Sequence, residues 1–451
     1  MHDYDSPNYQ QPVKVEARKR LLAHAVRTLT IERQNSAIVR LDELSSILSY
    51  AEWYLRQAGA PHDWLTSLSD EIKAFEDFYN SRLGTKQPGD LKVLYLCGPE
   101  PYNDLGVLLE LGCRPENIWV IESDQNLYGQ AVSQLTAKGI SIKVHKGSLE
   151  RFFKLVNSTF DLVYIDGCGP FLGGKPRTTA PLLELFARER LADFAVLITN
   201  YSEIPKEKQT AYANAMAHFF APRYNDVPTI LFEDGFDPAD SQLNPSGAIG
   251  WIKHRIIDCY SDFITRLTVD LGRRIIPISR IGAFRDVSSR FFTDAREFER
   301  ILALPKNDEN LLEWMNSKNI HMLGLPLVSF LLRSKECKDK DTNKLIEPIR
   351  SYTLNGSRID KTYPQFAPIE HVLEGYYHLA TPEFLAAIRT GWFDTRVRYF
   401  CDPPLPHLIF HLLVATYGHP YFVNTGKTLR ITYKAKQNRM YCDALVIDRC
   451  S

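Results

Sequence analysis

The sequence predicts an α/β protein whose core is a mostly parallel sheet with helices on both faces. Between residues 91 and 200, short apolar runs of strand character alternate with longer runs of helical periodicity. The first apolar run leads into a glycine, and the second and fourth end in acidic residues. This alternation favours parallel strands joined by right-handed crossovers, which bring the carboxyl ends of the strands to one edge.

Five strands and three preceding helices are expected from these patterns. The strands are expected at 93–96, 118–121, 140–146, 160–166 and 195–199. Apolar residues recurring at three and four positions predict the helices over 16–34, 41–59 and 64–84. Later segments of strand character cover 229–237 and 273–282, and 421–443 is expected to form a closing hairpin with a turn at Asn424-Thr425-Gly426.

The length of the chain and the change of its sequence pattern along it predict three domains. At 451 residues the chain exceeds one typical domain. We expect a helical cap over 1–85, the α/β domain over 86–285, and an α+β domain for substrate recognition or partner binding over 286–451. The helical cap could pack on the α/β domain or on a second subunit, so the sequence is consistent with a monomer and with a homo-oligomer.

Composition restricts the function classes. Lys plus Arg and Asp plus Glu both number 54, so any nucleic-acid or membrane site must be local. Eight cysteines without C-x-x-C pairing, and a polar N-terminus without a signal-peptide core, predict a cytoplasmic protein. His407 and His411 have no glutamate beside them, so no metal site is predicted.

Candidate ligand-binding residues follow the expected strands. Gly98 comes after the first strand and allows the backbone to approach a ligand closely. Glu122 ends the second strand, 24 positions after Gly98, near the roughly 20 expected of an acid that binds ribose hydroxyls. Gly147-Ser148 follow the third strand, and Asp166 ends the fourth.

In order and spacing, these residues resemble the class I S-adenosylmethionine-dependent methyltransferase superfamily over about residues 88–235. The resemblance implies a seven-stranded Rossmann-like sheet that binds S-adenosylmethionine across its first two strand ends. It implies Gly98 under the methionine portion and Glu122 at the ribose. It likewise implies Ser148 beside the adenine and Asp166 at the methyl group or substrate. The implied cofactor-binding residues are Cys97, Gly98, Pro99, Glu100, Glu122, Ser123, Asp124, Gly147, Ser148 and Asp166.

The first loop departs from the family pattern G-x-G-x-G, because it reads Gly98-Pro99-Glu100-Pro101. A pyrophosphate cofactor such as NAD needs the full glycine motif and a helix N-terminus free of acid. S-adenosylmethionine carries no phosphate, so the departure harms its binding less. The alternative is a Rossmann-like module that binds no cofactor, with Gly98 and Asp166 as turn residues.

Three residues at the ends of the fourth and fifth strands are candidates for the chemistry. Asp166 would accept a proton from an incoming hydroxyl or amine, or orient it. Asn200 and Tyr201 follow the fifth strand and would contact the substrate, although Asn200 is equally suited to capping a helix.

A basic segment with interleaved aromatic residues lies in the expected hairpin. Its charges precede the next acidic residue and are Lys427, Arg430, Lys434, Lys436 and Arg439. Such a ribbon can follow a phosphate backbone and stack on bases. Lysine-protected edge hairpins give the same pattern, so this alternative stays open.

The sequence thus predicts an S-adenosylmethionine-dependent methyltransferase that acts by direct transfer on an N or O acceptor, with nucleic acid slightly favoured. The alternative is a catalytically silent module that binds nucleic acid or protein within a larger assembly. A nucleotide- or NAD-binding enzyme is a third interpretation.

Overall fold

A computed structural model describes residues 11–41, 69–98, 100–173, 178–220, 245–288, 337–354, 421–435 and 438–449, with further positions within 43–49, 231–235 and 327–334. The chain divides into two compact units, which are described separately. One comprises residues 1–38, 83–205 and 423–448, and the other comprises 39–82, 206–422 and 449–451. The three-part division at 85/86 and 285/286 stays a prediction, because most of 286–420 lies outside the described residues.

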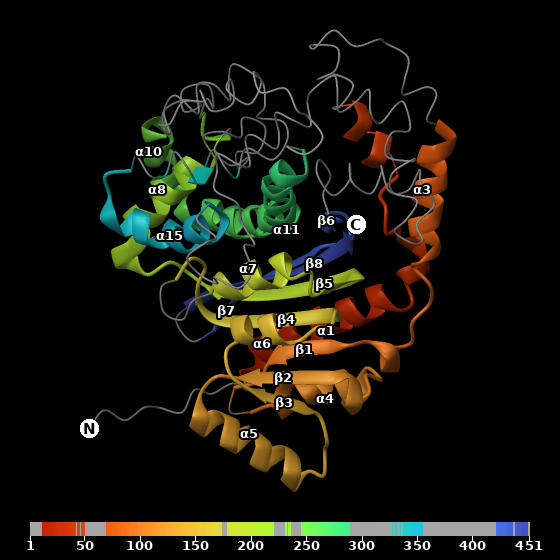
Figure 1. Ribbon diagram of the computed structural model, residues 1–451. Helices are drawn as coiled ribbons and strands as arrows, with labels where there is room; N and C mark the ends of the chain where they lie inside the picture. Colours follow the sequence, from red (N-terminus) through yellow and green to blue (C-terminus); the bar gives the residue numbers. More distant parts are fainter. Residues whose placement is uncertain are drawn as a thin grey trace, which may run out of the picture. The chain divides into compact units, whose positions relative to one another are not determined.

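One mixed sheet forms the core of the first unit (Figure 1). Its described strands number eight, in the order β3-β2-β1-β4-β5-β8-β6, with β7 also paired to β8. The parallel strands are β1 (Val93–Leu96), β2 (Ile118–Glu122), β3 (Lys143–Lys146), β4 (Phe160–Pro170) and β5 (Leu191–Ser202). The five expected strands and the Rossmann-like α/β fold are therefore confirmed.

The direction of the chain across the sheet reverses at β1, which has β2 on one side and β4 on the other. Right-handed crossovers then put α4 (Tyr102–Glu110) and α5 (Gln125–Ala137) on one face. They put α6 (Leu149–Leu155) and α7 (Ala180–Ala187) on the opposite face. The gap between the carboxyl ends of β1 and β4 is the switch point at which ligands bind in such sheets.

A late segment of the chain completes the sheet. β8 (Asn438–Arg449) runs antiparallel to β5, with Tyr201 opposite Tyr441. β7 (Leu429–Ala435) pairs antiparallel with β8 to form a hairpin, and β6 (Tyr421–Val423) neighbours β8 as well. A hairpin is thus present, but its predicted turn is wrong, because the two strands connect between Ala435 and Asn438, which lie opposite each other. The expected turn at Asn424-Thr425-Gly426 separates β6 from β7, because the Lys427 N–H donates to the Asn424 carbonyl at 3.2 Å. Because this turn divides the segment that pairs with β8 into β6 and β7, the sheet has eight described strands, whereas the resemblance implies seven.

The first helix, α1 (Pro12–Leu29), belongs to the same unit as the sheet. It packs against β5, β7 and α4 with an apolar stripe that includes the buried Leu21, Ala25 and Leu29. Short 3-10 turns follow at η1 (Arg33–Asn35), η3 (Pro88–Asp90) and η4 (Pro115–Asn117).

Helices make up the described part of the second unit. They are α3 (Ser69–Ser81), the 3-10 turn η5 (Lys206–Lys208), α8 (Gln209–Phe220), α10 (Ser246–His254), α11 (Ile256–Ser288) and α15 (Lys340–Leu354). Phe219 of α8 contacts Phe263 and Phe330, with ring centroids 5.1 and 5.4 Å away. Within the described ranges, no helix is both long and apolar enough to cross a membrane.

The strand expected at 273–282 is wrong, because the whole segment lies in α11. Leu267, Leu271 and Ile275 are fully buried at helical spacing, so packing of one helical face outweighs the local β-branched composition. Of the strand expected at 229–237, the described positions 231 and 233–235 are helix and turn.

Candidate functional site

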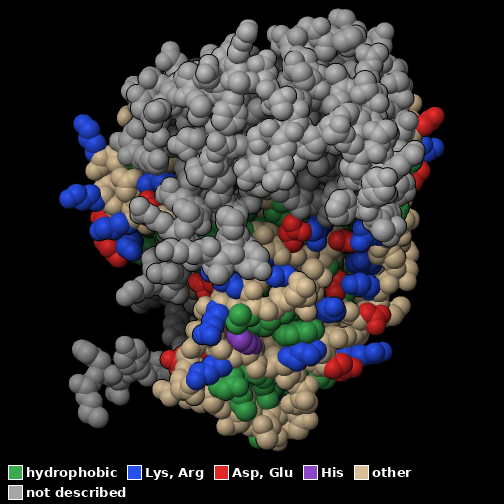
Figure 2. All heavy atoms as spheres, viewed as in Figure 1, with side chains coloured by type: hydrophobic (Ala, Val, Ile, Leu, Met, Phe, Trp, Pro, Cys, Tyr) green, Lys and Arg blue, Asp and Glu red, His purple; other side chains and the backbone are tan. Residues whose placement is uncertain are grey.

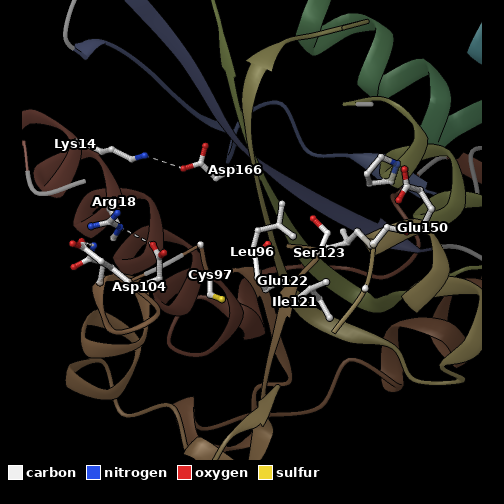
Figure 3. Close-up of a pocket in the computed structure, with 17 residues that line it drawn as sticks. Lys14, Arg18, Leu96, Cys97, Asp104, Ile121, Glu122, Ser123, Glu150 and Asp166 are labelled. Atoms are coloured by element: carbon white, nitrogen blue, oxygen red, sulfur yellow. Dashed lines mark hydrogen bonds and ion pairs between the residues drawn. The ribbon is translucent and has the colours of Figure 1, made fainter. Parts of the chain in front are cut away.

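A cavity of about 460 Å³ opens at the carboxyl ends of β1, β2 and β4 (Figure 3). Its lining is formed by Lys14, Arg18, Leu96, Cys97, Gly98, Glu100, Asn103, Asp104, Ile121, Glu122, Ser123, Gly147, Ser148, Leu149, Glu150, Asp166 and Pro181. All of these residues belong to the first unit. The cavity therefore lies at the switch point, and its volume falls in the range typical of small-molecule sites.

The loop after β1 is fixed by hydrogen bonds rather than by glycines. Gly98 adopts a left-handed conformation with φ of 59°, which favours glycine at this position. The buried Tyr95 hydroxyl donates to the Pro101 carbonyl at 2.8 Å, and Asn103 Nδ2 donates to Glu100 Oε2 at 2.7 Å. These bonds hold the loop against β1 and α4 although two of the family's three glycines are missing.

Glu122 ends β2 with its side chain in the cavity wall and only 8% exposed. Its Oε1 accepts a hydrogen bond of 2.8 Å from the Asp124 N–H, and its carbonyl accepts one of 2.9 Å from Gly147. Asp124 itself caps α5 by accepting from the Asn126 and Leu127 N–H groups, and it does not line the cavity. Of these two candidate acids, Glu122 is thus the one placed to meet a ligand.

Gly147 and Ser148 reach the cavity from the loop between β3 and α6. The Ser148 hydroxyl accepts from the Arg151 N–H at 3.3 Å and so caps α6. On the other side of the cavity, burial raises the pKa of the Cys97 thiol to about 12, with the Glu122 carboxylate adding to the shift. Cys97 therefore stays protonated and lines the site as a small apolar group. Pro99, the remaining residue of the implied set in this loop, lies outside the described residues.

Asp166 is held between two elements at the end of β4. Its Oδ1 accepts a hydrogen bond of 3.0 Å from Asn200 Nδ2, and its Oδ2 lies 3.2 Å from Lys14 Nζ. The buried Asn200 also donates to the Tyr433 hydroxyl at 3.1 Å and accepts from the Cys442 thiol at 3.0 Å. Asn200 thus orients the carboxylate from behind and does not itself line the cavity.

Tyr201 lies apart from this cluster. It is the next residue after Asn200 on β5, and successive side chains of a strand point to opposite faces. Its ring packs against Phe171 at 5.0 Å, and its buried hydroxyl has no hydrogen-bond partner among the residues that the structure describes. Burial raises the pKa of Tyr201, with the Asp443 carboxylate a smaller contribution. Tyr201 does not line the cavity, so we do not carry its predicted contact with substrate into the proposal.

Four charged residues of the cavity wall, Lys14, Arg18, Asp104 and Glu150, were not predicted from the sequence. Lys14 and Arg18 come from α1, and Arg18 Nε lies 2.6 Å from Oδ1 of Asp104 on α4. Burial raises the pKa of Asp104 to about 6, against the opposing effect of the Arg18 guanidinium. Lys14 and Arg18 lie one helical turn apart on a helix that carries charges of both signs, and such residues are usually exposed to solvent. Only the packing of α1 places both of them at the cavity.

The cavity wall is acidic on balance. Its carboxylates are Glu100, Asp104, Glu122, Glu150 and Asp166, and its basic side chains are Lys14 and Arg18. Asp104 also lies in the first turn of α4, where a bound phosphate would compete with it for the helix N-terminus. Among the described residues, no group of His, Cys, Asp and Glu has the geometry of a metal site. The wall therefore favours a cationic ligand over a pyrophosphate.

The predicted basic segment is part of the sheet, and its charges differ in environment. Lys427 Nζ donates to the Ser36 hydroxyl at 2.7 Å, and Arg430 Nε lies 3.1 Å from Asp443 Oδ1. Lys434 and Arg439 are exposed and directly opposite each other across the β7–β8 hairpin. Lys436 lies outside the described residues. Elsewhere on the visible described surface, acidic and basic side chains are interspersed (Figure 2).

The tip of this hairpin lies at the same edge of the sheet as the cavity. The Glu203 N–H, just after β5, donates to the Arg439 carbonyl at 2.8 Å. Since β5 is parallel to β4, the hairpin tip and Asp166 both lie at the carboxyl edge. Tyr433, one residue before Lys434, connects the hairpin to Asp166 through Asn200.

Comparisons with known proteins find partial structural similarities and no family. No family model and no curated protein matches the chain. Among solved structures, the chain is similar to an S-adenosylmethionine-dependent methyltransferase from Clostridium acetobutylicum, with 14% identity, 30% of this chain and 50% of that chain covered, and a TM-score of 0.21. It is also similar to an rRNA methylase from Streptococcus thermophilus, with 17% identity, 27% and 69% covered, and a TM-score of 0.21.

A third similar structure is the tRNA (uracil-54, C5)-methyltransferase of Pyrococcus abyssi in complex with S-adenosyl-L-homocysteine. Its identity to this chain is 15%, with 29% of this chain and 28% of that chain covered, and its TM-score is 0.19. The chain thus spans from about a quarter to two thirds of the lengths of these three proteins. Each similarity concerns the fold of one part of the chain and assigns no activity to it.

Proposed function

We propose that the protein is an S-adenosylmethionine-dependent methyltransferase. The observation that carries the proposal is the acid-rich cavity at the switch point, with Glu122 buried at the end of β2. A sulfonium and an ammonium group are cationic, so five carboxylates against two basic side chains complement them. The same wall would repel the phosphates of a dinucleotide.

The residues of the cavity suit the parts of this cofactor. Glu122 offers a carboxylate to the ribose hydroxyls, and Gly98 gives the backbone close access to the methionine portion. Ser148 borders the adenine end, and Asp166 faces the reacting end. When bound, the cofactor supplies an activated methyl group with a neutral thioether as leaving group. The protein then needs only to position the acceptor and receive its proton.

Asp166 is the residue assigned to the acceptor. An N–H or O–H group entering from the open side would donate to Oδ2, while Asn200 holds Oδ1. A carboxylate fixed in this way would orient a nitrogen or oxygen lone pair towards the methyl group and take up the proton afterwards. Asn200 acts through Asp166 and is a positioning residue.

Replacing Glu122 with glutamine is expected to weaken S-adenosylmethionine binding by roughly 10- to 100-fold, because charge-assisted hydrogen bonds to two hydroxyls are lost while the shape is kept. Isothermal titration calorimetry measures this change directly. Glu110→Gln, an exposed acid on α4, is the matched control and should bind as the wild type does.

Wild-type protein that binds neither S-adenosylmethionine nor S-adenosylhomocysteine at high ligand concentration would overturn the cofactor assignment. That result would support the alternative of a catalytically silent module. Competition by NAD would instead support the dinucleotide-binding interpretation.

Nucleic acid is the proposed source of the acceptor. The exposed pair Lys434 and Arg439 lies near the hairpin tip, at the same edge of the sheet as Asp166, so a strand held by its phosphates at the hairpin would pass near the cavity. Lys427 and Arg430 have partners within the sheet unit and contribute less to such a surface.

Single Lys434→Ala and Arg439→Ala variants are therefore expected to weaken single-stranded RNA or DNA binding and to reduce the slope of log K against log salt by about 0.7 each. Fluorescence anisotropy over a series of salt concentrations measures this slope. Lys19→Ala, on the exposed face of α1, controls for net charge and should leave the slope unchanged. An unchanged slope in both hairpin variants would contradict a role of the hairpin in nucleic-acid binding.

A further inference from the structure

A cation from the chain itself occupies the acceptor end of the cavity. Lys14 lies in the first turn of α1, and its Nζ is 3.2 Å from Asp166 Oδ2. Their side chains are 13% and 17% exposed, so the pair is largely withdrawn from solvent. Figure 3 shows the Lys14 side chain reaching from α1 towards Asp166. The methyltransferase assignment leaves this ion pair unexplained, since it engages the residue assigned to the acceptor.

The neighbouring ion pair is of a different kind. Arg18 Nε and Asp104 Oδ1 are 2.6 Å apart, and their side chains are 6% and 10% exposed. Removing either partner would leave a buried charge uncompensated, which proteins tolerate poorly. Lys14 carries its charge on a flexible four-carbon chain, lies nearer the solvent than Arg18, and is the cation that can yield to a ligand.

The charges of both Lys14 and Asp166 would interact with the sulfonium of a bound S-adenosylmethionine. Charges in a partly buried site interact several times more strongly than in water, and salt screens them less. The sulfonium would be attracted by Asp166 and repelled by Lys14, which also competes for the carboxylate. S-adenosylhomocysteine has the same shape without the methyl group and without the sulfonium charge, so this electrostatic effect is absent for it.

We propose that Lys14 is the specificity-determining residue that sets the relative affinities for S-adenosylmethionine and S-adenosylhomocysteine. This inference rests on the proposed function and concerns the same cavity. Lys14 neutralises Asp166 and lowers the preference for the cationic cofactor over its product, which lacks the sulfonium charge. Its displacement by the sulfonium or by the acceptor frees the Asp166 carboxylate for the acceptor.

The test is a calorimetric titration of both ligands into wild-type protein and four variants at low salt. Lys14→Ala and Lys14→Gln remove the charge and are expected to raise affinity for S-adenosylmethionine relative to S-adenosylhomocysteine by about fivefold. Lys14→Arg keeps the charge and should keep the wild-type ratio. Lys19→Ala removes a charge from the exposed face of the same helix and should also leave the ratio unchanged.

The outcomes separate this inference from the methyltransferase proposal. If the wild type binds both ligands and neither neutral Lys14 variant changes their affinity ratio, the role of Lys14 is overturned and the proposed function stands. If both neutral variants change the ratio no more than Lys19→Ala does, the conclusion is the same. If the wild type binds neither ligand, the proposed function fails, and the role of Lys14 fails with it.

Discussion

Replacing Asp166 with asparagine is expected to lower the rate of methyl transfer by roughly 10²- to 10⁴-fold, the usual range for a lost general base. The amide retains the shape of the carboxylate and can still meet Asn200, but it cannot take up a proton. Because the cofactor's ribose lies at Glu122 in the proposal, S-adenosylmethionine should still bind. We therefore expect the main loss in kcat, with a much smaller weakening of S-adenosylmethionine binding because Asp166 no longer offsets the charge of Lys14.

The measurement is single-turnover transfer of a radiolabelled methyl group to RNA or DNA, with cofactor binding followed separately by calorimetry. Asp124→Asn is the matched control, because it removes a carboxylate at the same edge and asparagine also caps helices well. Full methyl transfer by Asp166→Asn would remove Asp166 from the chemistry. Equal losses in the variant and its control would point to a general effect of charge.

Asp448→Asn is expected to change the pH dependence of stability more than other single substitutions in the sheet. Asp448 lies opposite Phe194 in the β5–β8 pairing and is 5% exposed. Its Oδ1 accepts no hydrogen bond within the part of the chain that the structure describes. Burial raises the pKa of Asp448 to about 7, although the Lys427 ammonium opposes the shift.

The direction follows from proton binding. A carboxyl whose pKa is about 7 when folded and about 4 when unfolded holds its proton more tightly in the folded state. Its contribution to stability is therefore most favourable below about pH 4 and is lost as the pH rises to 7. Asparagine does not titrate, so the stability of the variant relative to wild type should rise by about 3 kcal/mol between pH 5 and pH 8.

Urea denaturation at both pH values, followed by circular dichroism, measures this difference. Comparing one variant at two pH values cancels the fixed cost of burying an amide. Glu110→Gln gives the baseline for an exposed acid. A stability difference between Asp448→Asn and wild type that is the same at pH 5 and pH 8 would show that Asp448 does not titrate in this range.

The parallel half of the sheet was predictable because its signals are local. β1, β2, β4 and β5 are apolar runs between a helix pattern and a turn, the polar β3 occupies the sheet edge, and the crossover rule fixes which ends meet. Gly98, Glu122 and Asp166 were predicted at the cavity for this reason, and all three line it. The roles of these residues remain proposals.

Contacts between distant segments were not predictable in the same way. Lys14 reaches Asp166 only because α1 packs across β5 and β7, and nothing in the local sequence of α1 records that packing. The segment 273–282 was wrongly predicted as a strand, because isoleucines are common both in strands and on buried helix faces. The basic charges of 427–439 left a nucleic-acid-binding ribbon and a protected edge hairpin open, and they did not predict that Arg430 pairs with Asp443 on the adjacent strand.

The insertion of β8 beside β5 has a consequence for the order of folding. The hydrogen bond from Cys442 to Asn200 joins positions 242 apart in the sequence, whereas the parallel pairings join much closer positions, of which Val93 and Leu162 are the most widely separated. Closing so long a loop is entropically costly, so we expect β1–β5 to associate first and β8 to dock in a later, slower phase. Until then, β5 would present an unpaired apolar edge to other chains. Refolding yield should consequently fall with protein concentration, and the hydrogen bonds from Asn200 to Asp166 and Tyr433, which lie behind the cavity wall, would form last.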